Sequence, residues 1–302
     1  MTGTAGTVVT VGSFDGVHRG HQAVLAEIAR RATGAGRKSL LVTFDPHPLE
    51  VVNPDAAPKL LTTPDEKQEV LAASPVDDVV VLPFTRELSQ LSATEFVGTV
   101  LRERHGMVDL VLGYDHGFGR GRSGDVETVR RMGQEQGFTV DVVDAVRDDG
   151  QPISSTVIRT AVAHGELDRA ARWLGRPYAF SGAVERGAGR GRTIGIPTIN
   201  LTPPARKLLP PDGVFAVHVW VGGKQYGGMM NQGARPTFGV TARGLETHVF
   251  DFAGDLYGER VRVEWVRRLR DVRTFPSRDA LIAQLEHDRA AARESLNLSG
   301  TR

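Results

Sequence analysis

The residue types best suited to chemistry in the first half of the chain follow a short β-branched run that begins at Thr7. They belong to the string GSFDGVHRGH, whose candidate site residues are Gly12, Ser13, Phe14, Asp15, His18 and His21. The two histidines are three residues apart, so both lie on one face of the first turn of the helix that follows. Helix N-termini bind polyphosphate through backbone N–H groups, and glycines let the phosphate approach the backbone. The string therefore predicts a polyphosphate site in which both imidazoles donate hydrogen bonds as charge builds up on phosphoryl oxygens.

The same segment allows a second chemistry, a metal site. Its nitrogen and oxygen ligands would be Asp15, His18, His21 and His47. Metal ligands do not require neighbouring glycines, whereas a close approach of phosphate to the backbone does. The residue pattern therefore favours phosphate binding and leaves the metal site as the alternative.

A second string with chemical potential, GAGRGRTIGIPTIN, begins at Gly187. Its closely spaced glycines and two arginines can form a cationic lid over phosphate groups, although such a composition is also typical of a mobile hairpin. Thr198 and Asn200 lie two residues apart, so on a strand both side chains point to one face. The pattern predicts a phosphate-binding loop that leads into a strand.

The elements that must position the first string alternate between strands and helices. Helical patterns separate short β-branched runs, which begin near Thr7, Ser39, Asp78, Val108 and Phe138. This alternation predicts a Rossmann-like α/β domain with a parallel sheet. The first string follows the first strand, at the edge of the sheet where such domains bind ligands. Thr63 and Ser92 each begin a capping box, which supports two of the intervening helices.

The second half of the chain has a different texture. Beyond Gly175, Gly-rich turns separate strands without helical patterns between them, which predicts a small β-barrel. One amphipathic helix, capped by Ser277, closes the chain. The sequence thus predicts an α/β domain over residues 1–175 and a β-barrel domain with a terminal helix over residues 176–302.

The composition excludes several classes of function. The 302 residues are 40% hydrophobic and 24% charged, with 37 Lys and Arg against 36 Asp and Glu. A net charge of +1 gives no overall basic field for nucleic acid, and no stretch is apolar enough to cross a membrane. Because cysteine is absent, disulfides, thiolate metal sites and a cysteine nucleophile are excluded. We expect a cytoplasmic enzyme without nucleic-acid or membrane partners, as a monomer or weak homo-oligomer.

The first string resembles the phosphate-binding signature of the cytidylyltransferase-like nucleotidylyltransferases, whose core is HxGH. The second signature of that family, ISSTxxR, appears as ISSTVIR from Ile153. The ATP-binding residues that the resemblance implies are Gly12, Ser13, Phe14, Asp15, His18, His21, Gly113, Asp115, Ser154, Ser155, Thr156 and Arg159. Ser154 or Ser155 would also be a good helix cap, and capping is compatible with phosphate binding.

Two further segments resemble those that bacterial FAD synthetases place around FMN and the adenosine. They are FDPHP from Phe44 and GYDHGFGRGRSGD from Gly113. The flavin contacts that this likeness implies are Phe14, Phe44, Pro46, His47 and Pro48, while Asp115 would face the nucleotide. An X-Pro turn is the structural alternative for the FDPHP segment. His116 departs from the family pattern, in which that place carries an aromatic hydrocarbon side chain.

The second string, with its Pro-Thr-x-Asn ending, resembles the riboflavin kinase motif. The resemblance implies ATP binding by Gly187, Gly189, Gly191, Arg192, Thr198 and Asn200. It also implies that Thr198 and Asn200 hold Mg²⁺, and that Asn231 and Arg235 lie in the flavin and nucleotide region. By the same resemblance Glu246 is the general base for the acceptor hydroxyl.

These motifs occur in order from about Thr7 to Leu296, and together they resemble the bifunctional bacterial FAD synthetases. That family implies ATP-dependent phosphorylation of riboflavin to FMN in the second domain and adenylyl transfer from ATP to FMN, giving FAD, in the first. Mg²⁺ would assist, and the catalytic residues would be His18, His21 and Glu246. Two alternatives stand beside this interpretation: a single-function nucleotidylyltransferase with another phosphorylated acceptor, and a flavin-sensing or flavin-storage protein without turnover.

Overall fold

The structure is a computed structural model that describes residues 6–114, 117, 119, 124–187, 191, 195–237 and 240–298. For residues 235–237 and 240–242 it describes the backbone alone. By its internal contacts the chain divides into two compact units, Met1–Ser155 and Thr156–Arg302. The division falls at the start of a helix, ahead of the domain boundary expected near Gly175, which stays a prediction.

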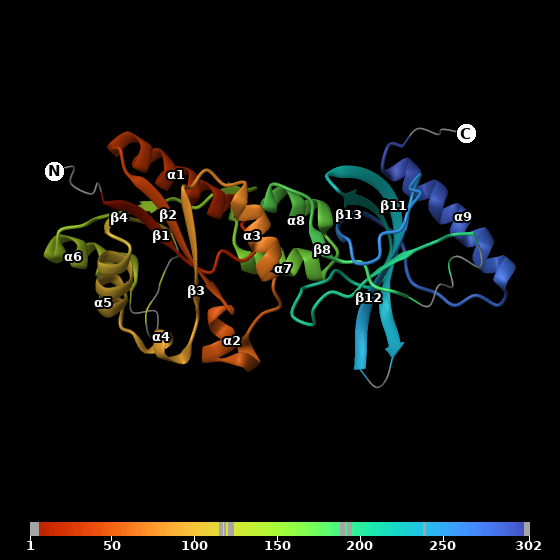
Figure 1. Cartoon of the computed structure of the whole chain (residues 1–302), viewed down its shortest axis with the longest axis horizontal. Helices are drawn as coiled ribbons and strands as arrows, with labels where there is room; N and C mark the ends of the chain where they lie inside the picture. The colour runs from red at the N-terminus through yellow and green to blue at the C-terminus, as the bar shows by residue number, and fades with distance from the viewer. Residues whose placement is uncertain are drawn as a thin grey trace. The chain divides into compact units, whose positions relative to one another are not determined.

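The first unit is built on a parallel sheet, of which Figure 1 labels β1 to β4. Its described strands run in the order β3-β2-β1-β4-β5. The strands are β1 (Thr7–Val11), β2 (Lys38–Asp45), β3 (Asp78–Pro83), β4 (Met107–Gly113) and β5 (Thr139–Val143). The helices are α1 (Arg19–Ala35), α2 (Pro48–Val52), α3 (Pro64–Ala72), α4 (Arg86–Gln90), α5 (Ala93–Glu95) and α6 (Val126–Gln136). Shorter or irregular elements are the 3-10 helix η1 (Pro54–Ala56), the π-helix η2 (Phe96–Arg104), and the paired strands β6 (Arg147–Asp148) and β7 (Gln151–Pro152).

The order of these strands creates a switch point beside β1. The chain moves outward from β1 to β3 and resumes at β4 on the other side of β1. Connections on either side of such a point diverge, which leaves a ligand-binding crevice outside the carboxyl ends of the strands. The first string of the sequence, from Gly12 onward, starts at this place.

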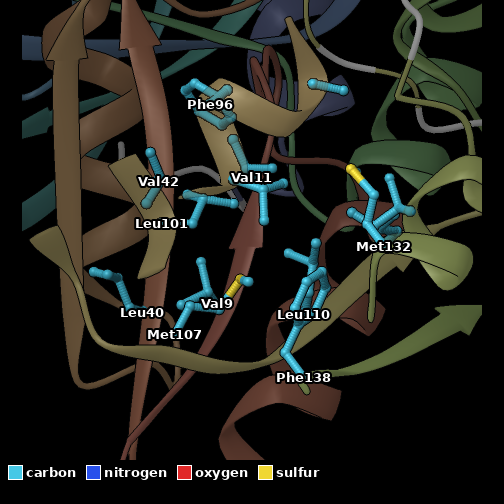
Figure 2. Packing of buried hydrophobic residues seen from close by; sticks show 14 of the residues in the cluster. Val9, Val11, Leu40, Val42, Phe96, Leu101, Met107, Leu110, Met132 and Phe138 are labelled. Carbon is cyan, nitrogen blue, oxygen red and sulfur yellow. The ribbon is translucent and has the colours of Figure 1, made fainter. Parts of the chain in front are cut away.

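Each face of the parallel sheet packs on its own hydrophobic cluster. Val9 belongs to the cluster that contains Phe96 (Figure 2). Val8 belongs to the cluster that contains Leu25 and Ile28 of α1. Successive strand residues point to opposite faces, so the uninterrupted apolar runs fill both clusters. Each fully buried side chain of this size contributes about 1.5–3 kcal/mol, which makes the sheet a rigid base for the loops at its edge.

The second unit holds an antiparallel sheet whose described strands run in the order β8-β13-β10-β11-β12-β9. The strands are β8 (Ala179–Ala183), β9 (Ile199–Leu201), β10 (Gly213–Val221), β11 (Lys224–Thr237), β12 (Val240–Val249) and β13 (Arg260–Arg270). The helices are α7 (Ser155–Ala163), α8 (Leu167–Leu174) and α9 (Arg278–Ser295), the last of which closes the chain (Figure 1).

The two edge strands of this second sheet meet. Glu185, just beyond β8, forms an antiparallel bridge with Asn200 of β9, and its N–H donates to the Asn200 carbonyl at 2.8 Å. The bridge brings the sheet close to a closed barrel. The predicted combination of a parallel α/β domain with a β-barrel and a terminal helix is therefore confirmed.

The terminal helix α9 docks on the barrel through apolar and charged contacts. Ala292 packs in a cluster with Met229 and Phe250 of the second unit. Asp288 is buried and receives hydrogen bonds from the Arg270 guanidinium at 2.6–3.0 Å. The Ser277 hydroxyl caps the helix by accepting from the Ala280 N–H at 3.1 Å, as expected.

The tryptophans of the chain all belong to the second unit. They are Trp173, Trp220 and Trp265. Trp173 and Trp265 are buried, and the Trp265 indole donates to the Gln232 amide oxygen at 3.1 Å.

Candidate active sites

The loop between β1 and α1 is held in a strained conformation. Phe14, Gly16 and Val17 have φ angles of 49°, 81° and 40°. A left-handed conformation is cheap for glycine but costs roughly 1–3 kcal/mol for other residues, most of all for a β-branched one. Such strain persists only where surrounding contacts impose it, and it is typical of ligand-binding loops.

His18 is the N-cap of α1. Its Nδ1 accepts a hydrogen bond from the His21 N–H at 3.3 Å. A nitrogen that accepts carries no proton in the neutral ring, so the proton of His18 is on Nε2. The cap therefore selects the tautomer in which Nε2–H is a donor, as the predicted phosphoryl contact needs.

Three rings stack at the start of α1. The His18 and His21 ring centroids are 3.7 Å apart, and those of Phe14 and His21 are 4.5 Å apart. Phe14 is buried at 4% exposure, so its ring is a fixed surface on which the His21 ring stacks. The flavin contact expected for Phe14 stays a prediction.

The two nucleotide signatures meet in the first unit. The Ser155 hydroxyl donates to the Asp15 carbonyl at 2.9 Å, although 140 residues separate them. A Cβ on Gly20 would lie 3.1 Å from the His18 ring, which is a tight contact, and 3.5 Å from the Ile153 carbonyl, which is an ordinary one, so the glycine leaves room for the His18 ring. Ile153 and Ser155 of the ISST segment thus lie next to the HxGH segment, and the nucleotide contacts expected of both segments stay predictions.

Asp15 anchors the strained loop to the segment before α3. Its carboxylate accepts hydrogen bonds from the Leu61 and Thr62 N–H groups, both at 3.0 Å. The Thr62 hydroxyl in turn accepts from the Gly16 N–H at 3.0 Å. Asp15 is buried at 3% exposure, and these contacts give its carboxylate a structural role beside the predicted nucleotide contact.

The metal alternative gains no geometric support. Among the described residues, which include Asp15, His18, His21 and His47, no group of three or more His, Asp or Glu side chains is arranged to hold a metal ion. The rings of His18 and His21 are stacked on one another, and the Asp15 carboxylate is directed to Leu61 and Thr62.

The segment after β2 forms the turn expected for FDPHP. Phe44 is buried and contacts Phe84 edge-on, with 5.2 Å between ring centroids. His47 caps α2 by accepting from the Leu49 N–H at 3.3 Å, and Pro48 occupies the first turn. The turn accounts for the positions of Pro46 and Pro48, and the predicted flavin contacts of this segment stay predictions.

Lys67 is a residue of this site that the sequence reasoning missed. Its ammonium is buried, and it donates to the carbonyls of Ser13 at 3.3 Å and Phe44 at 2.8 Å and to the Thr43 hydroxyl at 3.3 Å. Burial lowers the pKa of Lys67, and the nearby carboxylates of Asp15 and Asp45 oppose that shift. The available signal was a lysine on the apolar side of a helix, four residues before the buried Leu71.

In the second unit, three predicted kinase residues share one row of the barrel. Glu246 of β12 lies opposite Asn200 of β9 on one side and opposite Asn231 of β11 on the other. Directly opposed residues place their side chains on the same face of a sheet. The row therefore sets a carboxylate between two amides, and Glu246 is exposed while Asn200 is buried.

Two glycines of the second string pack against the kinase motif. A Cβ on Gly187 would collide with the Asn200 side chain, with 2.6 Å to its Cγ. A Cβ on Gly191 would collide with the Ile196 carbonyl and would lie 3.4 Å from the Thr198 hydroxyl. Both glycines let the backbone of the second string approach the Pro-Thr-x-Asn segment closely, which is a packing role in addition to any flexibility they give the loop. Thr198 lies just before β9, which begins at Ile199.

His248 is a second residue that sequence reasoning did not assign. Its Nδ1 lies 2.7 Å from the Pro197 carbonyl, so this nitrogen carries the proton. Burial lowers the pKa of His248, whereas the hydrogen bond to Pro197 raises it. The contact ties β12 to the Pro-Thr-x-Asn segment next to the row described above.

Residues 2–157 match the family model of FAD synthetase, and residues 174–296 match that of riboflavin kinase. The chain is 41% identical over 290 residues to the bifunctional riboflavin kinase/FMN adenylyltransferase of Pseudomonas fluorescens, with 95% of this chain and 92% of that protein covered. The chain belongs to this bifunctional family. The family member of Escherichia coli strain K12 is 39% identical over 295 residues, which are 97% of this chain and 94% of that protein.

A solved structure is similar to this chain over nearly its whole length. It is titled a macrolide-efflux protein from Streptococcus pneumoniae, has 33% sequence identity and a TM-score of 0.84, and covers 96% of this chain and 95% of its own. No helix in the described part of the present chain is long and apolar enough to cross a membrane.

The remaining predicted site residues fall into two groups, those outside the described residues and those on described elements. Asp115, His116, Gly189 and Arg192 lie outside the described residues, as does the side chain of Arg235. Thr156 and Arg159 lie on α7 in the second unit, and Gly113 ends β4 next to the β1 loop. Ser154 immediately precedes α7 and is partly buried.

Proposed function

We propose that this chain makes FMN and FAD. The second unit phosphorylates riboflavin with ATP, and the first unit transfers the adenylyl group of another ATP to the FMN phosphate. The observation that carries the proposal is the match of two family models to this chain. The FAD synthetase model matches residues 2–157 and the riboflavin kinase model matches residues 174–296, and each of these segments contains one of the candidate sites.

In the adenylyl transfer, a phosphate oxygen of FMN attacks the α-phosphorus of ATP. A new P–O bond forms, the bond between the α-phosphorus and the bridging oxygen breaks, and pyrophosphate leaves. No covalent nucleophile is required, so catalysis depends on position and on stabilising charge. His18 Nε2–H and His21 are the groups we assign to that charge.

The other ATP contacts are assigned to the loops around this pair. Gly12, Ser13 and Gly113 lie where β1 and β4 end. The start of α7, with Ser154, Ser155, Thr156 and Arg159, offers hydroxyls, N–H groups and a guanidinium for the β- and γ-phosphates. The flavin is assigned to the Phe44–Pro48 side of the same edge.

In the kinase reaction, Glu246 takes the proton of the ribityl 5′-hydroxyl as its oxygen attacks the γ-phosphorus, and ADP leaves. The row places Glu246 beside Asn200, so the base and the phosphate-binding motif lie within one strand spacing. Magnesium, when bound, would offset phosphate charge there. Thr198 and Asn200 would hold it, because a hydroxyl and an amide oxygen are hard ligands that this ion accepts.

The setting of the enzyme is part of the proposal. Its partners are flavins and ATP, and it works in the cytoplasm without nucleic acid or membrane, as a monomer or weak homo-oligomer. The near-balance of 37 basic and 36 acidic residues supports the first of these exclusions.

The test is a time course with purified protein, riboflavin, ATP and Mg²⁺, in which the three flavins are separated by chromatography. FMN should appear first and FAD should follow. FAD from added FMN, without FMN from riboflavin, would reduce the second unit to a binding module. No product from either flavin would favour a different acceptor or a storage protein, which direct flavin-binding measurements would then separate.

A further inference from the structure

Lys67 links two loops that carry different predicted substrates. Its ammonium donates to the Ser13 carbonyl, in the loop after β1, and to the Phe44 carbonyl and Thr43 hydroxyl, at the end of β2. The first loop is assigned to ATP and the second to FMN. We propose that Lys67 is a positioning residue for adenylyl transfer, which sets the distance between these two loops. The inference rests on the proposed function of the first unit.

The three contacts use the whole donor capacity of the lysine. An ammonium has three N–H donors and no acceptor, and the three described acceptors lie at 2.8–3.3 Å. Lys67 is 8% exposed, so removing the ammonium would take a donor from the Phe44 carbonyl and from the Ser13 carbonyl, which would keep the hydrogen bond from the Thr43 hydroxyl at 3.1 Å. An apolar side chain of similar length would fill the space but would remove the three hydrogen bonds of the ammonium, so that the direct contact between Thr43 and Ser13 would lose its support.

A second connection makes the lysine part of a stiff support. Leu61 and Thr62, which precede α3, donate to the Asp15 carboxylate. Between these contacts and Lys67 lies a complete capping box, in which Thr63 and Glu66 exchange hydrogen bonds at 2.8 and 3.3 Å. The segment 61–67 therefore holds the loop after β1 at both Ser13 and Asp15, and its Lys67 also contacts β2 at Thr43 and Phe44.

The reaction is sensitive to such a connection because it depends on alignment. The attacking FMN oxygen must stand in line with the α-phosphorus of ATP and its leaving group. Misplacement of a reacting group by an ångström can lower the rate by about a hundredfold. A defect in spacing should lower kcat of adenylyl transfer more than it raises either KM, because each loop keeps its own binding groups.

The experiment compares Lys67→Met and Lys67→Arg with the wild-type chain and with Lys38→Met. Lys38 begins β2 at the opposite end of the strand, and its side chain is 73% exposed in an ion pair with Asp78. For each protein, FAD formation from FMN and FMN formation from riboflavin are measured with kcat and KM. We expect Lys67→Met to lower kcat for FAD formation about tenfold to a hundredfold. The kinase activity of Lys67→Met, and both activities of Lys38→Met, should remain near those of the wild-type chain. Lys67→Arg should recover part of the loss.

Chemical rescue distinguishes loss of the ammonium group from loss of the fold. Lys67→Ala lacks three methylenes and the ammonium, which together equal n-propylammonium. Added n-propylammonium should raise FAD formation by Lys67→Ala several-fold, whereas 1-propanol, which is neutral and of similar length, should not. Equal action of the alcohol would overturn the assigned role of the charge.

The outcomes separate this inference from the proposed function. If the wild-type chain makes no FAD from FMN and ATP, the proposed function of the first unit fails. If the wild-type chain makes FAD and Lys67→Met matches it in kcat, the positioning role is wrong. A loss of activity that tracks only the folded fraction, measured by thermal melting, with no rescue by n-propylammonium, would likewise contradict it.

Discussion

His18 combines a structural and a chemical function in one ring. Nδ1 caps α1, and this contact leaves the proton on Nε2. The two functions use opposite edges of the imidazole, so a substitution can remove one of them and keep the other.

We predict that His18→Asn separates them. Asparagine is a good N-cap, so the melting temperature should stay close to wild type. The Nε2–H donor is lost, and FAD formation should fall by about a hundredfold to a thousandfold, the effect of removing one transition-state donor. His18→Ala should lose the same activity and also about 1 kcal/mol of stability. Retained FAD formation in His18→Asn, measured by chromatography of the flavins, would refute the catalytic assignment.

Gly187 owes its importance to Asn200 rather than to flexibility. We predict that Gly187→Ala pushes the Asn200 side chain out of the row beside Glu246, because a Cβ would stand 2.6 Å from Asn200 Cγ. Riboflavin kinase activity should fall at least about tenfold, the size expected when a phosphate-positioning group moves. FAD formation from added FMN should not change.

A matched glycine gives the control for this prediction. Gly233 lies on β11 in the same barrel, where a Cβ would meet only Val272 at 3.8 Å. Gly233→Ala should keep its kinase activity. Equal losses in both variants would mean that the barrel tolerates no added Cβ and that the contact with Asn200 is not special.

At the scale of elements, α1 carries two glycines with opposite requirements. Gly34 has open space around a built Cβ, whereas Gly20 faces the His18 ring at 3.1 Å. We predict that Gly34→Ala raises the stability of the first unit by about 0.5–1 kcal/mol, because alanine favours the helix. Gly20→Ala gains the same propensity but displaces His18, so its FAD formation should fall while its melting temperature changes little. Thermal melting and flavin chromatography on both variants check this.

The middle of α1 is tied to the sheet by an acid-sensitive network. Glu27 accepts hydrogen bonds from Arg30 and Arg31, and Arg31 continues to Asp109 and Asp141. The hydrogen bond from Arg30 is the largest cause that lowers the pKa of Glu27, to about 2 from 4.5. A carboxyl group whose pKa is lowered on folding stabilises the fold above its unfolded pKa and loses that contribution as the pH falls through the folded value.

We predict that Glu27→Gln is less stable than wild type at pH 7 and that the difference shrinks as the pH falls from 4.5 toward 2. The ion pair between Glu27 and Arg30 faces solvent, so the difference in unfolding free energy at pH 7 should stay below about 1 kcal/mol and decrease with added salt. Urea unfolding followed by circular dichroism at several pH values measures it. A difference that is independent of pH would indicate a packing effect instead.

The element pattern was largely predictable, and the exceptions have physical causes. Periodicity and capping boxes predict the parallel sheet and the helices α3 and α5, because both signals are local. The long strand β11 has little strand signal of its own, because it contains Gly227, Gly228 and Gly233 and owes its extended form to pairing with β10 and β12. Lys67 and His248 were missed as site residues because their partners lie 23 to 54 residues away in one case and 51 in the other.

At the scale of the whole molecule, the candidate kinase residues lie in the second compact unit, and the candidate adenylyltransferase residues lie in the first, apart from Thr156 and Arg159. Every tryptophan lies in the second unit, so intrinsic tryptophan emission reports on the barrel unit, and circular dichroism reports on both. If the units unfold separately, the change expected for Glu27→Gln, in the first unit, should appear in the dichroism and not in the emission. Comparing the two signals can thus tell whether an unfolding transition involves the second unit.

The meeting of Glu185 with Asn200 also bears on how the protein behaves in concentrated solution. Unpaired strand edges are templates on which other chains add strands and start to aggregate. Here the two edges of the second sheet meet at Asn200, the residue that also belongs to the kinase row. A substitution that opens the barrel at this point would expose two unpaired strand edges at once. Its result would be aggregation, seen as turbidity, as well as loss of riboflavin phosphorylation.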